Sequence, residues 1–145
     1  MHLVRQLLDR KGNTVHGVRP DASVFEALEV MAREDVGALV VQDDTGRLVG
    51  IVSERDYARK VVLRGRVSKD TPVREIMATE VICVGPDQTE QACMALMTKH
   101  RVRHIPVIDG GRLVGIVSIG DVVSAIIEGQ QFTIEQLEHY ISGRG

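Results

Sequence analysis

The amino-acid sequence predicts an α+β fold built from two tandem β-α-β-β-α repeats, with short helices at both ends of the chain. The octapeptide GRLVGIVS occurs at residues 46–53 and again, letter for letter, at residues 111–118. In each copy an aspartate, Asp56 or Asp121, follows the closing serine by three positions. A repeat this faithful in a chain of 145 residues indicates two copies of one structural unit. The apolar run inside each octapeptide is typical of a buried strand.

The composition argues against several classes of function. The formal net charge is −2 and the isoelectric point is near 6.2, so no strongly basic surface is expected to attract nucleic acid. Aromatic residues make up 3% of the chain and tryptophan is absent, which leaves few side chains on which bases could stack. We therefore expect no direct nucleic-acid partner.

The cysteines and the hydropathy pattern indicate where the protein works. Cys83 and Cys93 are the only cysteines, and their spacing does not match a zinc-binding motif. So few cysteines are typical of a reducing compartment. The sequence has neither an apolar stretch near eighteen residues nor a signal-peptide pattern at its start. We expect a cytoplasmic protein with no metal, no catalytic cofactor and no membrane association.

Each element of the first repeat has a local signature. Apolar residues recur at helical spacing within residues 1–11, and Gly12 ends that stretch. Ser23 and Glu26 form a capping-box pattern that starts a helix. Aspartate and glycine at residues 43–46 form the turn of a hairpin that leads into the octapeptide. The first repeat is therefore expected to hold strands at residues 14–18 and 38–41, the octapeptide strand, and a second helix at residues 54–63.

The second repeat follows the same order after a polar, basic linker at residues 64–71. Thr89 can cap its first long helix, but Ala92 stands where a capping box needs a glutamate, so this box is incomplete. The repeats are expected to span residues 1–66 and 67–130. The predicted elements of the second repeat are a short helix at 73–77, strands at 81–84 and 104–108, the octapeptide strand, and a helix at 119–128.

A short amphipathic helix is predicted in the last segment, residues 131–145, which has no counterpart in the first repeat. Thr133 is a good N-cap, and Ile134, Leu137 and Ile141 lie on one stripe. A helix this short is marginally stable alone, so it must pack on its own domain or on a second subunit. Together with the amino-terminal helix, it leads us to expect a homodimer with these segments near the interface.

The chemistry of the repeat lies in its Ser-x-x-Asp pairs, Ser53 with Asp56 and Ser118 with Asp121. A strand delivers the hydroxyl, and one helical turn later the carboxylate, to the same edge of the fold. Such a pair can hold a polyhydroxylated ligand such as a ribose, because a carboxylate accepts hydrogen bonds from both hydroxyls. The alternative is structural, since a carboxylate in the first turn of a helix is favoured by the helix dipole. The doubling of the pair favours ligand binding.

These motifs resemble the cystathionine-β-synthase (CBS) domain family, in the form of a small bacterial stand-alone tandem pair, or Bateman module. The resemblance rests on the paired GxxxGIVSxxD segments and on the sequence RHIPV at residues 103–107. It rests also on two matching openings, residues 15–23 and 81–89, each a valine followed by Pro-Asp and a hydroxyl residue. It implies two repeats related by pseudo-twofold symmetry and two clefts that bind adenosine-containing ligands such as AMP, ADP, ATP, NAD or S-adenosylmethionine. It also implies dimerisation.

The resemblance further implies which residues meet in each cleft. In both clefts the Ser/Asp pair of one repeat faces the start of the strands of the other, with isoleucine and valine around the adenine and cations at the phosphate. One cleft would contain Ile51, Ser53, Asp56, Ile82, Val102, Arg103 and His104. The other would contain Ile116, Ser118, Asp121, His16, Val36, Gly37 and Ala38.

The cationic residues near these positions differ in what they are expected to do. Arg103 and His104 begin a strand and match phosphate-contact positions of the family, whereas the preceding basic residues 99–101 are typical of a solvated helix end. Arg55 lies beside Asp56 and could reach a phosphate. His16 is expected to contribute backbone and ring packing.

The sequence predicts a nucleotide-sensing module with no catalysis of its own. It has no nucleophile–base pair, no HExxH motif and no phosphate loop of the GxxxxGK type. Two other functions stay open: an assembly module that acts only by dimerising, and a regulatory subunit of a separate effector protein. The choice of ligand among AMP, ATP and NAD also stays open.

Overall fold

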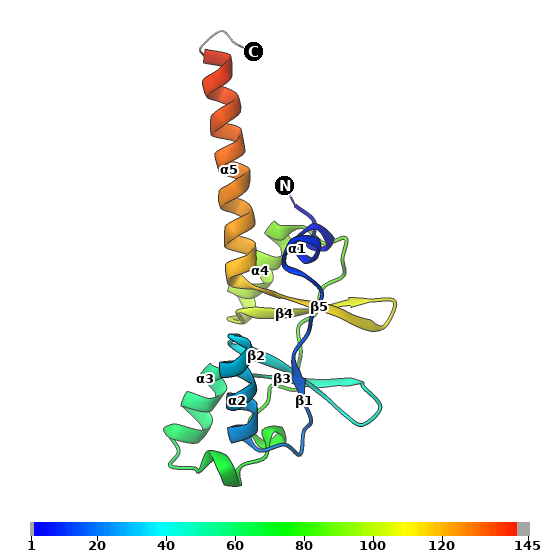
Figure 1. The fold of residues 1–145 in the computed structure, drawn as a ribbon, viewed down its shortest axis with the longest axis vertical. Helices are drawn as coiled ribbons and strands as arrows, with labels where there is room; N and C mark the ends of the chain where they lie inside the picture. Colours follow the sequence, from blue (N-terminus) through cyan, green and yellow to red (C-terminus); the bar gives the residue numbers. More distant parts are fainter. Residues whose placement is uncertain (1, 142–145) are drawn as a thin grey trace. The chain divides into compact units, whose positions relative to one another are not determined.

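The protein forms two compact units in a computed structural model that describes residues 2–141 (Figure 1). The 14–82 unit consists of Thr14–Ile82, and the 83–145 unit joins Cys83–Gly145 to the amino-terminal segment Met1–Asn13. Each unit contains one copy of the octapeptide. The predicted boundaries at residues 66 and 130 separate the sequence repeats. They stay predictions, because each compact unit is defined by contacts in space, and one unit combines two separate segments of the chain.

The 14–82 unit is a three-stranded sheet flanked by helices. Strand β2 pairs with β1 in parallel and with β3 in antiparallel orientation, so β2 is central. The strand predicted at residues 14–18 is shorter than expected, because only two of its residues pair with β2. The elements are β1 (Gly17–Val18), α2 (Val24–Glu34), β2 (Ala38–Gln42), β3 (Leu48–Ser53), α3 (Glu54–Tyr57), the π-helical turn η1 (Ala58–Val62), and the 3₁₀ turns η2 (Ser68–Asp70) and η3 (Val73–Glu75).

The 83–145 unit repeats this plan around the antiparallel hairpin β4–β5. The strand predicted at residues 81–84 is reduced to a single bridge, in which Val84 pairs in parallel with Val107 through hydrogen bonds to Pro106 and Ile108. Helix α1 belongs to this unit although it begins the chain. The elements are α1 (Val4–Lys11), α4 (Glu90–His100), β4 (His104–Asp109), β5 (Arg112–Ser118) and α5 (Ile119–Ile141).

Helix α5 corrects the prediction of two helices separated near Thr133. It runs without a break from Ile119 to Ile141. Thr133 is not an N-cap: its hydroxyl donates to the carbonyl oxygen of Gly129 at 3.0 Å, a bond to the preceding turn that threonine commonly makes inside helices. Residues 142–145 of the predicted tail lie outside the described part of the chain.

The caps of the two long helices act as the sequence predicts. Ser23 Oγ accepts a hydrogen bond from the backbone N–H of Glu26, and Thr89 Oγ1 accepts one from that of Ala92. These bonds satisfy donors that the helix leaves unpaired at its start. The short helix predicted at residues 73–77 is wrong in type, since η3 is one 3₁₀ turn.

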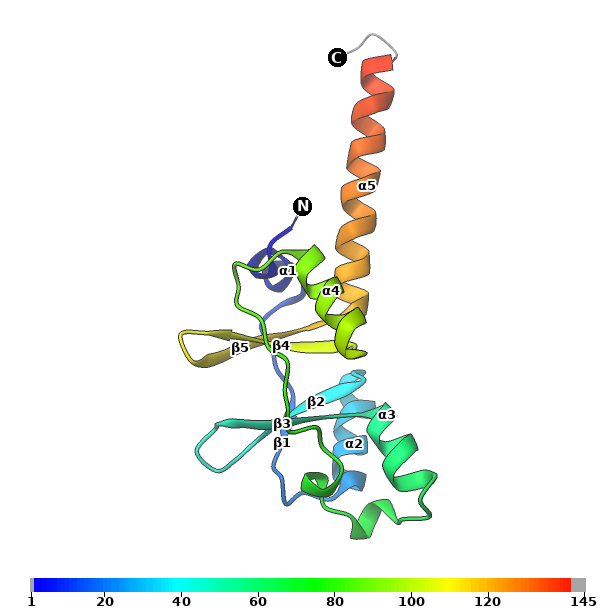
Figure 2. The same ribbon diagram turned by 180° about the vertical axis from the view of Figure 1, so that it is seen from behind.

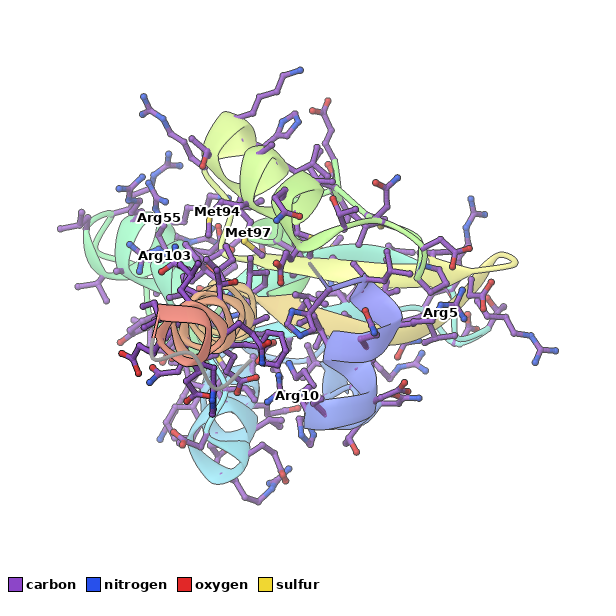
Figure 3. All side chains as sticks on the ribbon, turned by 90° about the horizontal axis from the view of Figure 1, so that it is seen from above. Arg5, Arg10, Arg55, Met94, Met97 and Arg103 are labelled. Carbon is purple, nitrogen blue, oxygen red and sulfur yellow. The ribbon has the colours of Figure 1, made fainter. Side chains whose placement is uncertain are left out.

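Each unit has its own apolar core between its hairpin and its helices. In the 14–82 unit the core is centred on Leu39, Val41 and Val52 of the sheet. In the 83–145 unit, Ile105, Val107 and Val117 take the same positions, and α1, α4 and α5 pack on them. Looking down on α5, Figure 3 shows Met94 and Met97 of α4 on the side that faces α5.

The hairpin of each unit is covered by a segment that lies outside the hairpin's own repeat in the sequence. Residues 77–78 cover the hairpin of the 14–82 unit, and α1 covers that of the 83–145 unit. In the 14–82 unit, residues 77–78 lie on the octapeptide so closely that a Cβ at Gly50 would come within 2.6 Å of Met77 Sδ. Ile51 and Ala78 exchange two backbone hydrogen bonds there. In the 83–145 unit α1 takes this place, and a Cβ at Gly115 would lie 2.6 Å from Leu8 Cδ2. The same glycine of the octapeptide therefore allows an extended segment to pack closely on one hairpin and a helix to pack closely on the other.

Polar contacts fasten α1 to the 83–145 unit. His2 Nδ1 lies 3.0 Å from Glu90 Oε2, and the backbone N–H groups of Val4 and Arg5 donate to carbonyl oxygens just before α4. Arg10, labelled in Figure 3, forms an ion pair with Glu128 of α5. None of the helices described between residues 2 and 141 is both long and apolar enough to cross a membrane.

Candidate functional site

Each octapeptide strand ends in a hydrogen-bonded Ser-x-x-Asp box. The backbone N–H of Ser53 donates to Asp56 Oδ2 at 2.9 Å, and the backbone N–H of Asp56 donates to Ser53 Oγ at 3.3 Å. In the other box the corresponding distances are 2.7 Å for Ser118 to Asp121 and 3.2 Å for the return bond. The serine is the N-cap and the aspartate is its capping partner. Both carboxylates are therefore held in a fixed orientation at the start of a helix.

A lysine ammonium lies against each carboxylate, and sequence reasoning missed both. Lys60 Nζ lies 3.1 Å from Asp56 Oδ1 and donates to the carbonyl oxygen of Ile76 at 2.9 Å. Lys11 Nζ lies 2.6 Å from Asp121 Oδ2 and donates to the carbonyl oxygen of Ile116 at 2.9 Å. The i,i+4 spacing of Asp56 and Lys60 was a usable signal. No local pattern links Lys11 with Asp121.

The start of β2 lies directly beside the first box. Ala38 pairs with Ser53 across the hairpin, and the backbone N–H of Glu54 donates to the carbonyl oxygen of Gly37 at 3.1 Å. Val36 is half-buried just before this strand. His16 contributes its backbone, since its carbonyl oxygen accepts from Val40, while its ring Nε2 lies 3.7 Å from a carboxylate oxygen of Glu34.

The start of β4 has the same place beside the second box but carries larger side chains. His104 pairs with Ser118 across the hairpin, and the backbone N–H of Ile119 donates to the carbonyl oxygen of Arg103 at 2.8 Å. Arg103 is exposed and His104 is half-buried (Figure 3 labels Arg103). Lys11 contacts the Asp121 carboxylate directly, and the charges of Lys11 and Arg103 also act on the His104 imidazole.

The neighbouring groups shift the ionisation equilibria of Asp121 and His104. Burial opposes the ionisation of Asp121, but hydrogen bonds from Lys11 and from Ser118, with the lysine charge, outweigh it and lower the pKa of the carboxyl. The pKa of His104 is lowered, first by burial and then by the charges of Lys11 and Arg103, while Asp121 acts in the opposite direction. At neutral pH the site therefore holds a carboxylate and a neutral imidazole.

The predicted site residues are distributed over both units. Within each unit the structure brings the Ser/Asp box together with the start of the neighbouring strand of the same unit, whereas both predicted clefts combine residues of the two units and stay predictions. The 14–82 unit contains His16, Val36, Gly37, Ala38, Ile51, Ser53, Arg55, Asp56 and Ile82, and the 83–145 unit contains Val102, Arg103, His104, Ile116, Ser118 and Asp121.

The structure also locates the side chains that could bind a metal ion and the two cysteines. Among residues 2–141 no three His, Cys, Asp or Glu side chains gather closely enough to hold a metal ion. Cys93 is buried in the core, whereas Cys83 is exposed. Val84, the next residue, takes the buried position that pairs with β4.

The chain matches a known protein family and several known structures. The family model of the CBS domain matches residues 11–63 and 73–128. The CBS domain-containing protein CBSX3, mitochondrial, of Arabidopsis thaliana is 39% identical over 148 residues, which cover 97% of this chain and 72% of the relative. A protein with CBS domains from Burkholderia ambifaria is 50% identical in sequence, with a TM-score of 0.85 and coverage of 92% of this chain and 99% of that one.

A more distant structure contains ligands. The CBS domain pair of protein MJ0100 is 27% identical, with a TM-score of 0.78, and the match covers 90% of this chain and 98% of that one. That protein was solved in complex with 5′-methylthioadenosine and S-adenosyl-L-methionine.

Proposed function

The chain belongs to the CBS domain family, and from this we propose that it is a non-catalytic regulatory module that binds an adenosine-containing ligand, AMP, ATP or NAD. The two domain matches make it a tandem pair. Support for the ligand class comes from MJ0100, whose domain pair binds two adenosine derivatives. We also propose that it acts in the cytoplasm, as its cysteine usage suggests.

The observation that carries this proposal is the pair of oriented carboxylates. Asp56 and Asp121 keep 19% and 23% of their side chains exposed, so each is held by its capping box and still accessible to a ligand. A ribose offers two adjacent hydroxyl donors, and an ionised carboxylate offers two acceptor oxygens. Ile51 and Ile116, half-buried two residues before each serine, supply apolar surface for a purine ring.

Phosphate would be bound by the cations that surround these carboxylates. We propose that the boxes face the opposite repeat, as the family resemblance implies, so that Arg103 and His104 serve the cleft of Asp56. Lys60 and Lys11 add an ammonium beside each carboxylate, so both clefts have a cation. Arginine adds a forked donor that suits phosphate, and the cleft that contains Arg103 should bind phosphorylated ligands more tightly.

A panel of ligands tests the proposal. Adenosine, AMP, ATP, NAD, S-adenosylmethionine and 5′-methylthioadenosine are added separately, with GMP as the matched non-adenine control, while thermal unfolding is followed. A ligand at a hundredfold excess over its dissociation constant stabilises the folded state by about 2.7 kcal/mol, which raises the unfolding temperature by several degrees. If no adenine compound raises it, the protein is an assembly module and the proposal is wrong.

Calorimetry of Arg103→Ala then tests the phosphate assignment. The variant should lose affinity for AMP about tenfold at one site and keep its affinity for adenosine, because adenosine has no phosphate. Lys99→Ala is the control, since Lys99 is an exposed cation in the last turn of α4. Equal AMP affinity in the two variants would remove Arg103 from the site.

We propose further that the protein is a homodimer. The chain leaves large apolar side chains exposed on α5, among them Ile127, Phe132, Ile134 and Leu137. Light scattering should give about twice the chain mass of 16.0 kDa. A mass that stays at 16.0 kDa at all concentrations would contradict the dimer.

A further inference from the structure

The second half of α5 exposes its side chains over the length that the structure describes. Every residue from Gln130 to His139 is exposed, and α5 extends past α1 and α4 in both ribbon views (Figures 1 and 2). A helical segment of this length is marginally stable without tertiary contacts. Its sequence must therefore be explained by something that packs against it.

The exposed apolar residues of α5 follow a heptad repeat. Val123, Ile127, Ile134 and Leu137 are 39%, 55%, 53% and 56% exposed. With Gln130 they alternate at spacings of four and three residues, so that isoleucine occupies the a positions 127 and 134, and 123, 130 and 137 are d positions. The sequence continues the pattern with isoleucine at position 141. We call Val123, Ile127, Gln130, Ile134 and Leu137 the α5 seam.

We propose that the α5 seam pairs with the α5 seam of a second copy as a parallel, in-register, two-stranded coiled coil. Among parallel coiled coils, β-branched isoleucine at a with leucine at d, as at Ile134 and Leu137, favours two strands. This inference rests on the homodimer proposed above and assigns its interface and orientation.

The single polar residue in the seam selects the orientation. In a parallel, in-register pair, Gln130 lies opposite its own copy, and the two amides can bond to each other. In an antiparallel pair that sets a against d, Gln130 would lie opposite Ile134, and a buried amide without a partner destabilises the structure. A polar residue at one core position is a known determinant of register in coiled coils.

The flanking charges permit the parallel arrangement. The positions beside the seam in the exposed half are Gln131 and Glu138 on one side and Thr133 on the other. A parallel pair brings Thr133 opposite the partner's Glu138, so like charges do not meet there. The inner side of the first half of α5 is occupied, because Val122, Ala125 and Ile126 pack in the core of the unit. The seam therefore runs from the edge of this core along the projecting half of α5.

A matched pair of charged substitutions tests the interface. Ile134→Asp places a carboxylate in the seam, and Phe132→Asp places one on an exposed apolar residue outside it, since Phe132 is 63% exposed at an f position. Analytical ultracentrifugation should show a dimer dissociation constant at least tenfold higher for Ile134→Asp, with Phe132→Asp within about twofold of the original chain. If both variants remain dimers with the same dissociation constant, the α5 seam is not the interface, although the protein is still a homodimer.

Cysteine cross-linking tests the orientation. In a Cys83→Ser background, which removes the exposed native thiol, Leu137→Cys should form a disulfide with itself under mild oxidation. Phe132→Cys should not. In the antiparallel pair that sets Gln130 opposite Ile134, Leu137 would approach the partner's Ile127, about 15 Å along the helix from position 137. Cross-linking of Ile127→Cys with Leu137→Cys, without the 137–137 product, would overturn the parallel register. A chain that is monomeric at all concentrations would overturn both the homodimer and the seam.

Discussion

Lys11 Nζ lies 2.6 Å from Asp121 Oδ2, although 110 residues separate the two in the sequence. The identical octapeptide of the other unit obtains its lysine from within one helical turn, where Lys60 lies 3.1 Å from Asp56. Two sites with the same strand and the same capping box therefore depend on different parts of the chain for their charge balance.

Lys11 and Asp121 should be coupled in stability. Lys11→Met should destabilise the protein at neutral pH, because it removes a cation from a carboxylate whose pKa is lowered and also from the carbonyl oxygen of Ile116. The pair keeps 31% and 23% of its side chains exposed, so solvent screening limits the coupling energy to roughly 0.2–1 kcal/mol. Urea unfolding of Lys11→Met, Asp121→Asn and the double variant measures it.

The corresponding double-mutant cycle, with Lys60→Met, Asp56→Asn and the double variant, is the control for local helix effects. Asp56 of α3 and Lys60 of the following turn η1 are an i,i+4 pair, for which a coupling of about 0.3–0.5 kcal/mol is usual in helices. Lys11→Met should also expose α1 to faster amide exchange, and Lys60→Met should not. Additive effects of Lys11→Met and Asp121→Asn would show that the contact contributes nothing.

Ligand affinity should depend on both aspartates. Asp56→Ala or Asp121→Ala removes the acceptor of two ribose hydroxyls and should weaken the binding of an adenosine nucleotide at least tenfold at its own site, since each bond to a charged group is worth about 1.5–3 kcal/mol. The loss of a capping residue will also destabilise the helix by about 1 kcal/mol. Calorimetry well below the unfolding temperature separates the two effects. Asp44→Ala, in an exposed turn, should bind normally. A folded double variant with unchanged affinity would exclude the aspartates from the site.

Stability should decline as the pH falls below neutrality, in part because of His104. Burial and the charges of Lys11 and Arg103 lower its pKa in the folded state, whereas in the unfolded chain it titrates near 6.5. The unfolded chain therefore takes up more protons between about pH 6.5 and the lower folded pKa, and the free energy of unfolding decreases over that window. Thermal unfolding between pH 8 and pH 5 should show a smaller decrease for His104→Gln. His100→Gln, an exposed site, should leave the decrease in place.

The two octapeptide glycines should respond differently to alanine. At Gly50 an added Cβ would lie 3.0 Å from the carbonyl oxygen of Ala78, whose backbone is held by its bonds to Ile51. We expect a loss of about 1–3 kcal/mol. At Gly115 the added atom meets only the end of the Leu8 side chain, which can rotate, and the loss should be smaller. Gly129→Ala is the control of opposite sign, because that position is open and helical, and it should stabilise by up to about 1 kcal/mol. Urea unfolding measures all three.

The sequence predicted those features that depend on residues close together in the chain. The hairpins, the caps at Ser23 and Thr89 and the Ser-x-x-Asp boxes all follow from patterns within a few residues. The contact of Lys11 with Asp121 could not be predicted, because 110 residues separate the two in the sequence and only the packing of α1 in the 83–145 unit brings them together. The strand expected at residues 81–84 is reduced to Val84, since apolar composition alone does not say which residues find a backbone partner.

The error at Thr133 has a different cause. A threonine before an apolar stripe is a good helix start only if the preceding residues are not already helical. The heptad pattern passes through Gly129 without interruption, and the apolar spacing of the whole of α5 was the better guide. The pairing of clefts across the two units remains a prediction, since it depends on contacts far apart in sequence.

The place of α1 has a consequence for how the protein is made. A ribosome releases α1 before residues 14–82, which form a compact unit of their own. The buried residues Leu7 and Leu8 of α1, however, pack with β4 and β5, which are synthesised some hundred residues later. A helix of eight residues is not stable alone, so α1 should stay unfolded and accessible to chaperones until β5 has emerged. Helix α1 is then translated before the 14–82 unit but folds after it.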